Sequence, residues 1–240
     1  MRLALITGGS RGLGHALCDA LTAHGWRVVE FSRSAPHAYS VRIDLAAPEA
    51  ARQTIAATLA VLAKEPIDEL LVVANAGTLD PIGAVSKKPP AEVLANLHTN
   101  FTSAILFIAE AVARFQATPC RKVVAVVSSG AAQRGYAGWS LYCAAKAGLE
   151  NFIRSLAAEQ QAEATPFLAI NIVPGVVDTG MQAVIRATPA ADFPSVQRFI
   201  DLKHNDALAS PAQVAAAIHR IVTLPTLAQG ERYDVADHRG

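Results

Sequence analysis

Three side chains near the middle of the chain, Ser129, Tyr142 and Lys146, are of types that could together move a proton at a carbonyl or alcohol oxygen. Ser129 follows an apolar run from Val123 to Val127, which predicts a buried strand. Open α/β sheets bind their ligands at the carboxyl ends of such strands. Tyr142 and Lys146 are four residues apart in a predicted helix, so they share one helix face. The spacing predicts that a hydroxyl, a phenol and an ammonium converge.

The ammonium decides what the phenol can do. A free phenol titrates near pH ~10, and a fixed ammonium beside it favours the phenolate. We expect Lys146 to lower the pKa of Tyr142 by an amount worth roughly 4 kcal/mol, which would allow proton transfer at neutral pH. Ser129 would hydrogen-bond the same oxygen and hold it in place. Taken alone, the pair also fits a half-buried aromatic beside a solvated lysine, so the rest of the chain must decide.

Size and composition are typical of one α/β domain. The chain has 240 residues, 52% of them hydrophobic and 17% charged, with a net charge of +1. We therefore expect an ordinary soluble globular protein in which residues 1–240 form a single domain. There is no basic stripe and no apolar run of about 20 residues, so we expect no nucleic-acid or membrane partner. Three cysteines without metal-ligand spacing and the lack of a signal peptide predict a cytoplasmic protein with no metal site.

Alternating strands and helices must position these side chains. We expect strands at 2–6, 27–32, 41–45, 69–74, 123–127, 167–173 and 231–236. We expect helices after the first strand to 24, at 48–63, at 91–115 with a break near 98, at 140–163, and from 211 onward. This alternation predicts a Rossmann-type, doubly wound parallel sheet of seven strands in the order 3-2-1-4-5-6-7. Residues 178–206 have weak periodicity and predict a helical lid over the substrate.

The first strand runs into a glycine-rich turn, residues 7–14, and then into a helix. This arrangement is typical of dinucleotide binding, because glycines allow a close approach and the N–H groups at the helix start meet the pyrophosphate. The expected cofactor contacts in the turn are Gly8, Ser10, Arg11, Gly12, Leu13 and Gly14.

The end of the second strand indicates which dinucleotide binds. Where NAD-binding folds place an acid, this chain has Ser32 followed by Arg33. A serine and an arginine suit a 2′-phosphate, and Arg11 could be a second cation. Arg33 could also be a plain surface charge. On balance the residues favour NADP(H).

Other cofactor contacts are expected at the same edge of the sheet. Asp44 could contact the adenine or cap the following helix, and Thr179 could hold the nicotinamide amide, hold a phosphate or cap a helix. Asn100 could form a water-mediated link to Lys146 or be an indifferent surface residue. The remaining expected contacts are Leu45, Asn75, Ala76, Gly77, Pro174, Gly175 and Val177, with Tyr142 and Lys146.

Taken in order, these motifs resemble the short-chain dehydrogenase/reductase family along essentially the whole chain. The matching segments are 7–14, 75–77, 142–146 with Ser129 upstream, and 174–175. The resemblance implies a catalytic tetrad of Asn100, Ser129, Tyr142 and Lys146, and a homodimer or homotetramer packed through two long helices. Ala74 departs from the pattern, because many members carry a second asparagine there, and we expect only a small local effect.

A narrower resemblance is to the sepiapterin and benzil reductase subgroup, and it rests on segments 138–144, 177–182 and 199–203. It implies that Asp234 anchors the substrate, although Asp234 could equally be a surface acid at a strand end. With Ser129 and Tyr142, we expect Trp139 and Met181 to contact the substrate.

The resemblance implies an NADPH-dependent reductase that converts a ketone or diketone to an alcohol, with Tyr142 as proton donor. One rival is a 3-oxoacyl-thioester reductase, which a basic patch at the mouth of the active site would favour. A rival of another class is a non-catalytic NADP-binding regulator, which the presence of all four tetrad residues disfavours.

Overall fold

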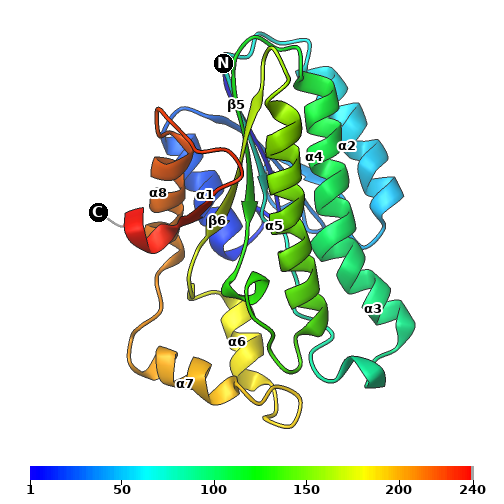
Figure 1. Cartoon of the computed structure of the whole chain (residues 1–240), viewed down its shortest axis with the longest axis vertical. Coiled ribbons are helices and arrows are strands. Elements are labelled where there is room, and N and C mark those ends of the chain that lie inside the picture. Colours follow the sequence, from blue (N-terminus) through cyan, green and yellow to red (C-terminus); the bar gives the residue numbers. More distant parts are fainter. Residues whose placement is uncertain (239–240) are drawn as a thin grey trace.

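Apolar segments of the chain alternate between strands and helices, and every strand joins one parallel sheet (Figure 1). The computed structural model describes residues 1–238. The strands are β1 (Arg2–Thr7), β2 (Arg27–Ser32), β3 (Ser40–Arg42), β4 (Glu69–Ala74), β5 (Arg121–Val127), β6 (Phe167–Val173) and β7 (Arg232–Asp234). Their order is β3-β2-β1-β4-β5-β6-β7, which confirms the predicted topology.

Helices cover both faces of the sheet. On one face lie α1 (Gly12–Ala23) and α8 (Pro211–Val222), and on the other lie α2 (Pro48–Leu62), α4 (Ser103–Phe115) and α5 (Ser140–Gln160). Successive side chains of a strand point to opposite faces, so both sides of each central strand must be apolar. In β1, Leu3 and Leu5 are buried in the core on the α4 and α5 side, whereas Ala4 and Ile6 are buried under α1 and α8.

The predicted break in the long helix at 91–115 is confirmed. The segment consists of α3 (Pro90–Leu97), a π-helical turn η2 (His98–Thr102) and then α4. A π turn inserts an extra residue into a helix and frequently occurs at functional sites. Here it carries Asn100.

Two predicted strands end earlier than expected, because a turn begins within each. After β3, the Oδ1 atom of Asp44 accepts a hydrogen bond from the Ala46 amide at 3.0 Å, which directs the chain toward α2. After β7, the Oδ1 atom of Asp234 accepts one from the Ala236 amide at 2.9 Å, and the 3₁₀ helix η4 (Val235–His238) begins.

The expected lid is built from two short helices, α6 (Gly180–Ala187) and α7 (Val196–His204). Figure 1 shows them together at the end of the molecule where α5 begins. A short 3₁₀ helix η3 (Gly130–Ala132) between β5 and α5 lies at the same end, as does η1 (Val85–Lys87) after β4.

Candidate active site

The predicted triad side chains come together at the carboxyl end of β5. Ser129 follows this strand, and its Oγ accepts a hydrogen bond from the Ala131 amide at 3.1 Å. Because α5 begins at Ser140, Tyr142 and Lys146 lie in its first two turns on one face. The Nζ atom of Lys146 lies 5.6 Å from the centroid of the Tyr142 ring. Both side chains are buried, with Tyr142 8% and Lys146 3% exposed.

The predicted lowering of the Tyr142 pKa by Lys146 is wrong for this structure. Burial raises the pKa of Tyr142 to about 12, and a hydrogen bond with Ser129 offsets only part of this effect. Lys146 donates from Nζ to the carbonyl oxygen of Val127 at 2.7 Å, and burial lowers its own pKa to about 8. Desolvation of the phenolate is therefore the largest influence on the pKa of Tyr142. At neutral pH, Tyr142 holds its proton, which is the form of a proton donor.

Asn100 is fully buried in the π-helical turn, so the alternative of an indifferent surface residue is wrong. Its Oδ1 accepts a hydrogen bond from the Thr78 amide at 2.8 Å, and its Nδ2 donates to the Thr78 carbonyl at 2.8 Å and to Asn96 at 2.9 Å. A Cβ on Gly77 would lie 3.3 Å from Asn100 Oδ1 and 3.9 Å from Lys146 Nζ. The amide oxygen and the ammonium thus face one space, although the water-mediated link stays a prediction.

Sequence reasoning missed a buried carboxylate, Glu150, one helical turn after Lys146. It is 2% exposed, and its Oε1 accepts hydrogen bonds at 2.5 Å from both the Ser128 hydroxyl and an Arg232 guanidinium N–H. Arg154 lies 3.3 Å from its Oε2. The negative charge of Glu150 raises the pKa of Lys146 against the larger lowering by burial. An acid four residues after Lys146 on the same face was the available signal.

The glycine turn is held against β4 as the motif predicts. Gly8 has a φ of 74°, and a Cβ on it would lie 2.8 Å from the Cα of Ala76. A Cβ on Gly14 would lie 2.1 Å from the carbonyl oxygen of Gly8. The Nδ2 atom of Asn75 donates to the carbonyls of Thr7 and Gly8, both at 3.1 Å. The motif at residues 75–77 therefore fixes the turn, and no larger residue fits at these two glycines.

The turn leads into the N-terminus of α1, which begins at Gly12, and no described side chain caps this helix end. Ser10 and Leu13 are half-buried in the same turn. A Cβ on Gly12 would lie 3.3 Å from the Cγ2 of Thr179, which is the N-terminal cap residue of α6. The segment after β6 therefore reaches the glycine turn, and two distant groups of predicted cofactor residues lie side by side.

Ser32 does not offer a free hydroxyl proton to a 2′-phosphate. Its Oγ donates to the Oε1 of Glu30 at 2.8 Å and accepts from the Ala35 amide at 3.2 Å. Glu30, which sequence reasoning also missed, is fully buried within β2. It also accepts from the Ser40 hydroxyl at 2.5 Å and from the Gly9 amide at 3.2 Å. An acid within the apolar β2 was the signal for it.

Arginines are the remaining candidates for a 2′-phosphate. Arg11 and Arg33 are exposed and have no ion-pair partner within residues 1–238. Arg42, also exposed, pairs in register with Ser32 across β3 and β2. These three side chains belong to the carboxyl ends of β1, β2 and β3 or to the turns that follow, which is the expected side of the sheet.

Other predicted contacts lie at the same edge. Asp44 is exposed and takes part in its own turn, and its adenine contact stays a prediction. Leu45 is buried, and its carbonyl accepts a hydrogen bond from Ser103 at 2.7 Å. Pro174, Gly175 and Val177 follow β6 directly, with Pro174 and Val177 buried.

Helices α6 and α7 and the loop between them pack onto Tyr142 and Trp139 through a cluster of apolar and aromatic side chains. Trp139 stacks on Phe193 with ring centroids 4.3 Å apart and makes an edge contact with Tyr142 at 6.0 Å. Phe199 of α7 lies 5.5 Å from Trp139, and Met181 of α6 packs against the same cluster. The structure thus brings Trp139 and Met181 to Tyr142.

Asp234 lies at the carboxyl end of β7, in register with Val173 of β6. Its Oδ1 accepts a hydrogen bond from the Ala236 amide, which makes it a turn residue. A role in anchoring the substrate stays a prediction.

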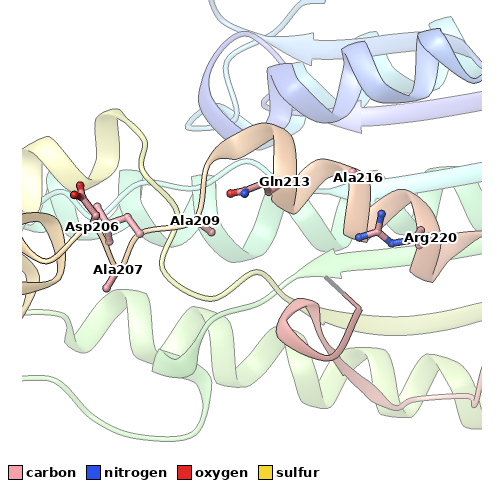
Figure 2. A pocket seen from close by; sticks show the side chains of 7 residues that line it. Asp206, Ala207, Ala209, Gln213, Ala216 and Arg220 are labelled. Atoms are coloured by element: carbon pink, nitrogen blue, oxygen red, sulfur yellow. The ribbon is translucent and has the colours of Figure 1, made fainter. Parts of the chain in front are cut away.

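A hollow elsewhere on the molecule contains none of the predicted site residues. It lies between the loop after α7 and helix α8, with Asp206 at one end, Gln213 between and Arg220 at the other (Figure 2). Within the described part of the chain, no group of three or more His, Cys, Asp or Glu side chains could hold a metal ion. Residues 1–238 also contain no helix with the length and apolar character needed to span a membrane.

Comparison with known proteins agrees with the geometry. The chain is 33% identical over 242 residues to benzil reductase ((S)-benzoin forming) of Bacillus subtilis, covering 99% of each chain. It is 28% identical over 258 residues to sepiapterin reductase of Meriones unguiculatus, covering 98% of this chain and 97% of the relative. A short-chain dehydrogenase/reductase from Saccharomyces cerevisiae superposes with a TM-score of 0.83 at 26% identity over 100% of both chains.

The model of the short chain dehydrogenase family matches residues 2–190. This region contains the glycine turn, Asn100, Ser129, Tyr142 and Lys146. The chain therefore belongs to the short-chain dehydrogenase family, whose members are oxidoreductases that use NAD(H) or NADP(H).

Proposed function

We propose that this protein uses NADPH to reduce a ketone or diketone carbonyl to an alcohol, as the names of its benzil and sepiapterin reductase relatives suggest. The observation that carries the proposal is that Tyr142 is buried after the carboxyl end of β5, with Lys146 on the same face of α5 and aromatic rings packed against it. A buried phenol beside a positioned hydroxyl is suited to donating a proton to a carbonyl oxygen.

The residues at the sheet edge fit a dinucleotide. The glycine turn leaves no room for side chains at Gly8 and Gly14, and the N-terminus of α1 faces that turn without a described side-chain cap. Backbone N–H groups of that kind bind phosphate. Arg11 and Arg33 would hold the 2′-phosphate, since the Ser32 proton is engaged with Glu30. When bound, the cofactor would supply a hydride to the carbonyl carbon.

This chain's own residues would complete the reduction. Ser129 would hold the carbonyl oxygen, and Tyr142 would transfer its phenolic proton to that oxygen as the carbonyl becomes an alcohol. Lys146 would hold the ribose and keep a positive charge near the resulting phenolate, and Asn100 would keep a water in the path that returns the proton. We further propose that residues 178–206 act as the lid of a single domain, and that the protein forms a homodimer or homotetramer.

The test is Tyr142→Phe, which removes the proton donor and keeps the ring contact with Trp139. We expect kcat for benzil reduction to fall by about 10² or more, because general acid catalysis typically contributes that much. NADPH binding, measured by fluorescence titration, should change little. Wild-type turnover in this variant would refute the proposed mechanism, and no turnover of any carbonyl compound by the wild-type protein would refute the function.

A further inference from the structure

Two arginines at the lid converge on one phenol oxygen. Arg134, in the segment between β5 and α5, donates from Nε to the Tyr136 Oη at 2.7 Å. Arg198, on helix α7, donates from Nη1 to the same oxygen at 2.9 Å. The two guanidinium groups therefore lie within a few ångström of each other, although they come from segments about sixty residues apart in the sequence.

This pair carries two positive charges that no described acid balances. Neither Arg134 nor Arg198 forms an ion pair within residues 1–238, and both are exposed. A neutral phenol oxygen can accept from both, but it does not remove the repulsion between like charges. A carboxylate would offset this repulsion with its negative charge, and its two oxygens match the planar donors of guanidinium groups.

The pair is connected to the catalytic tyrosine by ring contacts. Tyr136 lies 5.2 Å from Trp139 between ring centroids, and Trp139 lies 6.0 Å from Tyr142. The indole Nε1 of Trp139 is buried and has no hydrogen-bond partner among the described residues. Because Trp139 is buried and stacked on Phe193, a substrate whose carbonyl is held at Tyr142 would pass over the half-buried Tyr136 and place its far end at the two arginines.

We propose that Arg134 and Arg198 bind a carboxylate on the carbonyl substrate, separated from the reacting carbonyl by about one aromatic ring. This inference rests on the proposed carbonyl reductase activity and specifies its substrate class as aromatic keto acids. The arginines are specificity residues, since the carboxylate they bind is remote from the atoms that react. Tyr136 positions the two guanidinium groups while the carboxylate is absent.

The experiment compares 4-carboxybenzil with its methyl ester as substrates, because both carry the same diketone and only the first carries an anion. For the wild type we expect a higher kcat/KM with the acid. In Arg134→Gln and Arg198→Gln, kcat/KM for the acid should fall about tenfold each, mainly through KM, with little change for the ester. Added salt should lower kcat/KM for the acid and leave kcat/KM for the ester unchanged.

Two matched variants separate charge from structure. Tyr136→Phe removes the shared oxygen and keeps both charges, so the preference for the acid should persist. Arg114→Gln removes an exposed arginine on α4 and should leave kcat/KM unchanged for both the acid and the ester. If the Arg134 and Arg198 variants lose kcat/KM equally for the acid and the ester, the proposal is overturned in favour of a lid-closing role.

Two further results would also overturn it. If the ester is reduced but the acid is disfavoured in every variant, the carboxylate has no site here, while the reductase function stands. If a 3-oxoacyl carrier-protein thioester, and not 4-carboxybenzil, depends on both arginines, the partner is an acidic protein. If neither diketone is reduced by the wild type, the failure is that of the proposed function itself.

Discussion

Two buried carboxylates lie beneath the two halves of the site, and they are held in different ways. Glu30, beneath the cofactor half, accepts only from neutral groups, namely two hydroxyls and the Gly9 amide. Glu150 lies beneath the half of the site that we propose to be catalytic, and it accepts from the Ser128 hydroxyl and from the guanidinium groups of Arg232 and Arg154. The first organises a turn, whereas the second is part of a charged network that also contains Lys146.

This difference has an energetic consequence. Removing one partner of a buried ion pair leaves an uncompensated charge, which typically costs about 3–5 kcal/mol. Replacing a carboxylate that accepts only neutral hydrogen bonds leaves one donor unsatisfied, which costs about 1–3 kcal/mol. The catalytic half should therefore be the more sensitive of the two to loss of its acid.

The largest predicted effect is on stability. We expect Glu150→Gln to lower the free energy of unfolding by about 3–5 kcal/mol, because Arg232 would keep its charge without its main partner. Glu30→Gln should cost about 1–3 kcal/mol. Urea unfolding of both variants measures the difference.

A double variant, Glu150→Gln with Arg232→Gln, should recover part of the loss if the ion pair is its cause. If Glu30→Gln proves at least as destabilising as Glu150→Gln, the contrast between the two halves is wrong.

The next effect is a dependence of stability on pH that Lys146 contributes in the catalytic half. Above pH 9 it is opposed by Cys18 beside Glu30, because burial raises the pKa of the Cys18 thiol to about 12. Burial lowers the pKa of Lys146 from 10.5 to about 8, so between these values the unfolded chain binds more protons than the folded one. The free energy of unfolding should therefore rise as pH increases from 8 to 10, by about 2 to 3 kcal/mol from this group. Above pH 10 the raised pKa of Tyr142 acts in the opposite direction, since the folded chain then keeps the proton longer.

Unfolding measured across this range in the wild type and in Lys146→Met isolates the lysine. Glu150→Gln should move the rise to lower pH, because the ammonium loses the negative charge that supports it. Glu30→Gln should leave the Lys146 contribution, measured as the difference between variants with and without Lys146→Met, at the same pH, although it removes a charge that raises the pKa of Cys18. A shift of that difference would contradict the separation of the two networks.

The smallest effect concerns the cofactor half. Arg33→Ala should reduce kcat/KM for NADPH about tenfold and leave that for NADH nearly unchanged, because only NADPH carries a 2′-phosphate. Ser32→Ala should have less effect on this ratio, since its proton is directed to Glu30. Steady-state rates with both cofactors decide the matter. A larger loss in Ser32→Ala would mean that the serine turns toward the phosphate.

Much of the site could be predicted because parallel strands end at one edge of the sheet. Residues that follow β1, β4, β5 and β6 must meet there, which is why motifs at 7–14, 75–77, 129 and 174–175 could be assigned to one site. The interruption of the long helix was predicted near residue 98, but its π-helical geometry was not. The ends of β3 and β7 were not predicted correctly, because the side chains of Asp44 and Asp234 form local turns there.

By itself, the sequence determined the order of the strands, the position of the glycine turn and the spacing that puts Tyr142 and Lys146 on one face of α5. These depend on local periodicity and on the direction of parallel strands. Only the tertiary structure decided the electrostatics. The direction in which the pKa of Tyr142 shifts depends on how completely the packed side chains around it bury the phenol. The partner of Glu150 is Arg232, 82 residues away. Burial and long-range charge pairing arise only when distant segments pack together, so no local pattern encodes them.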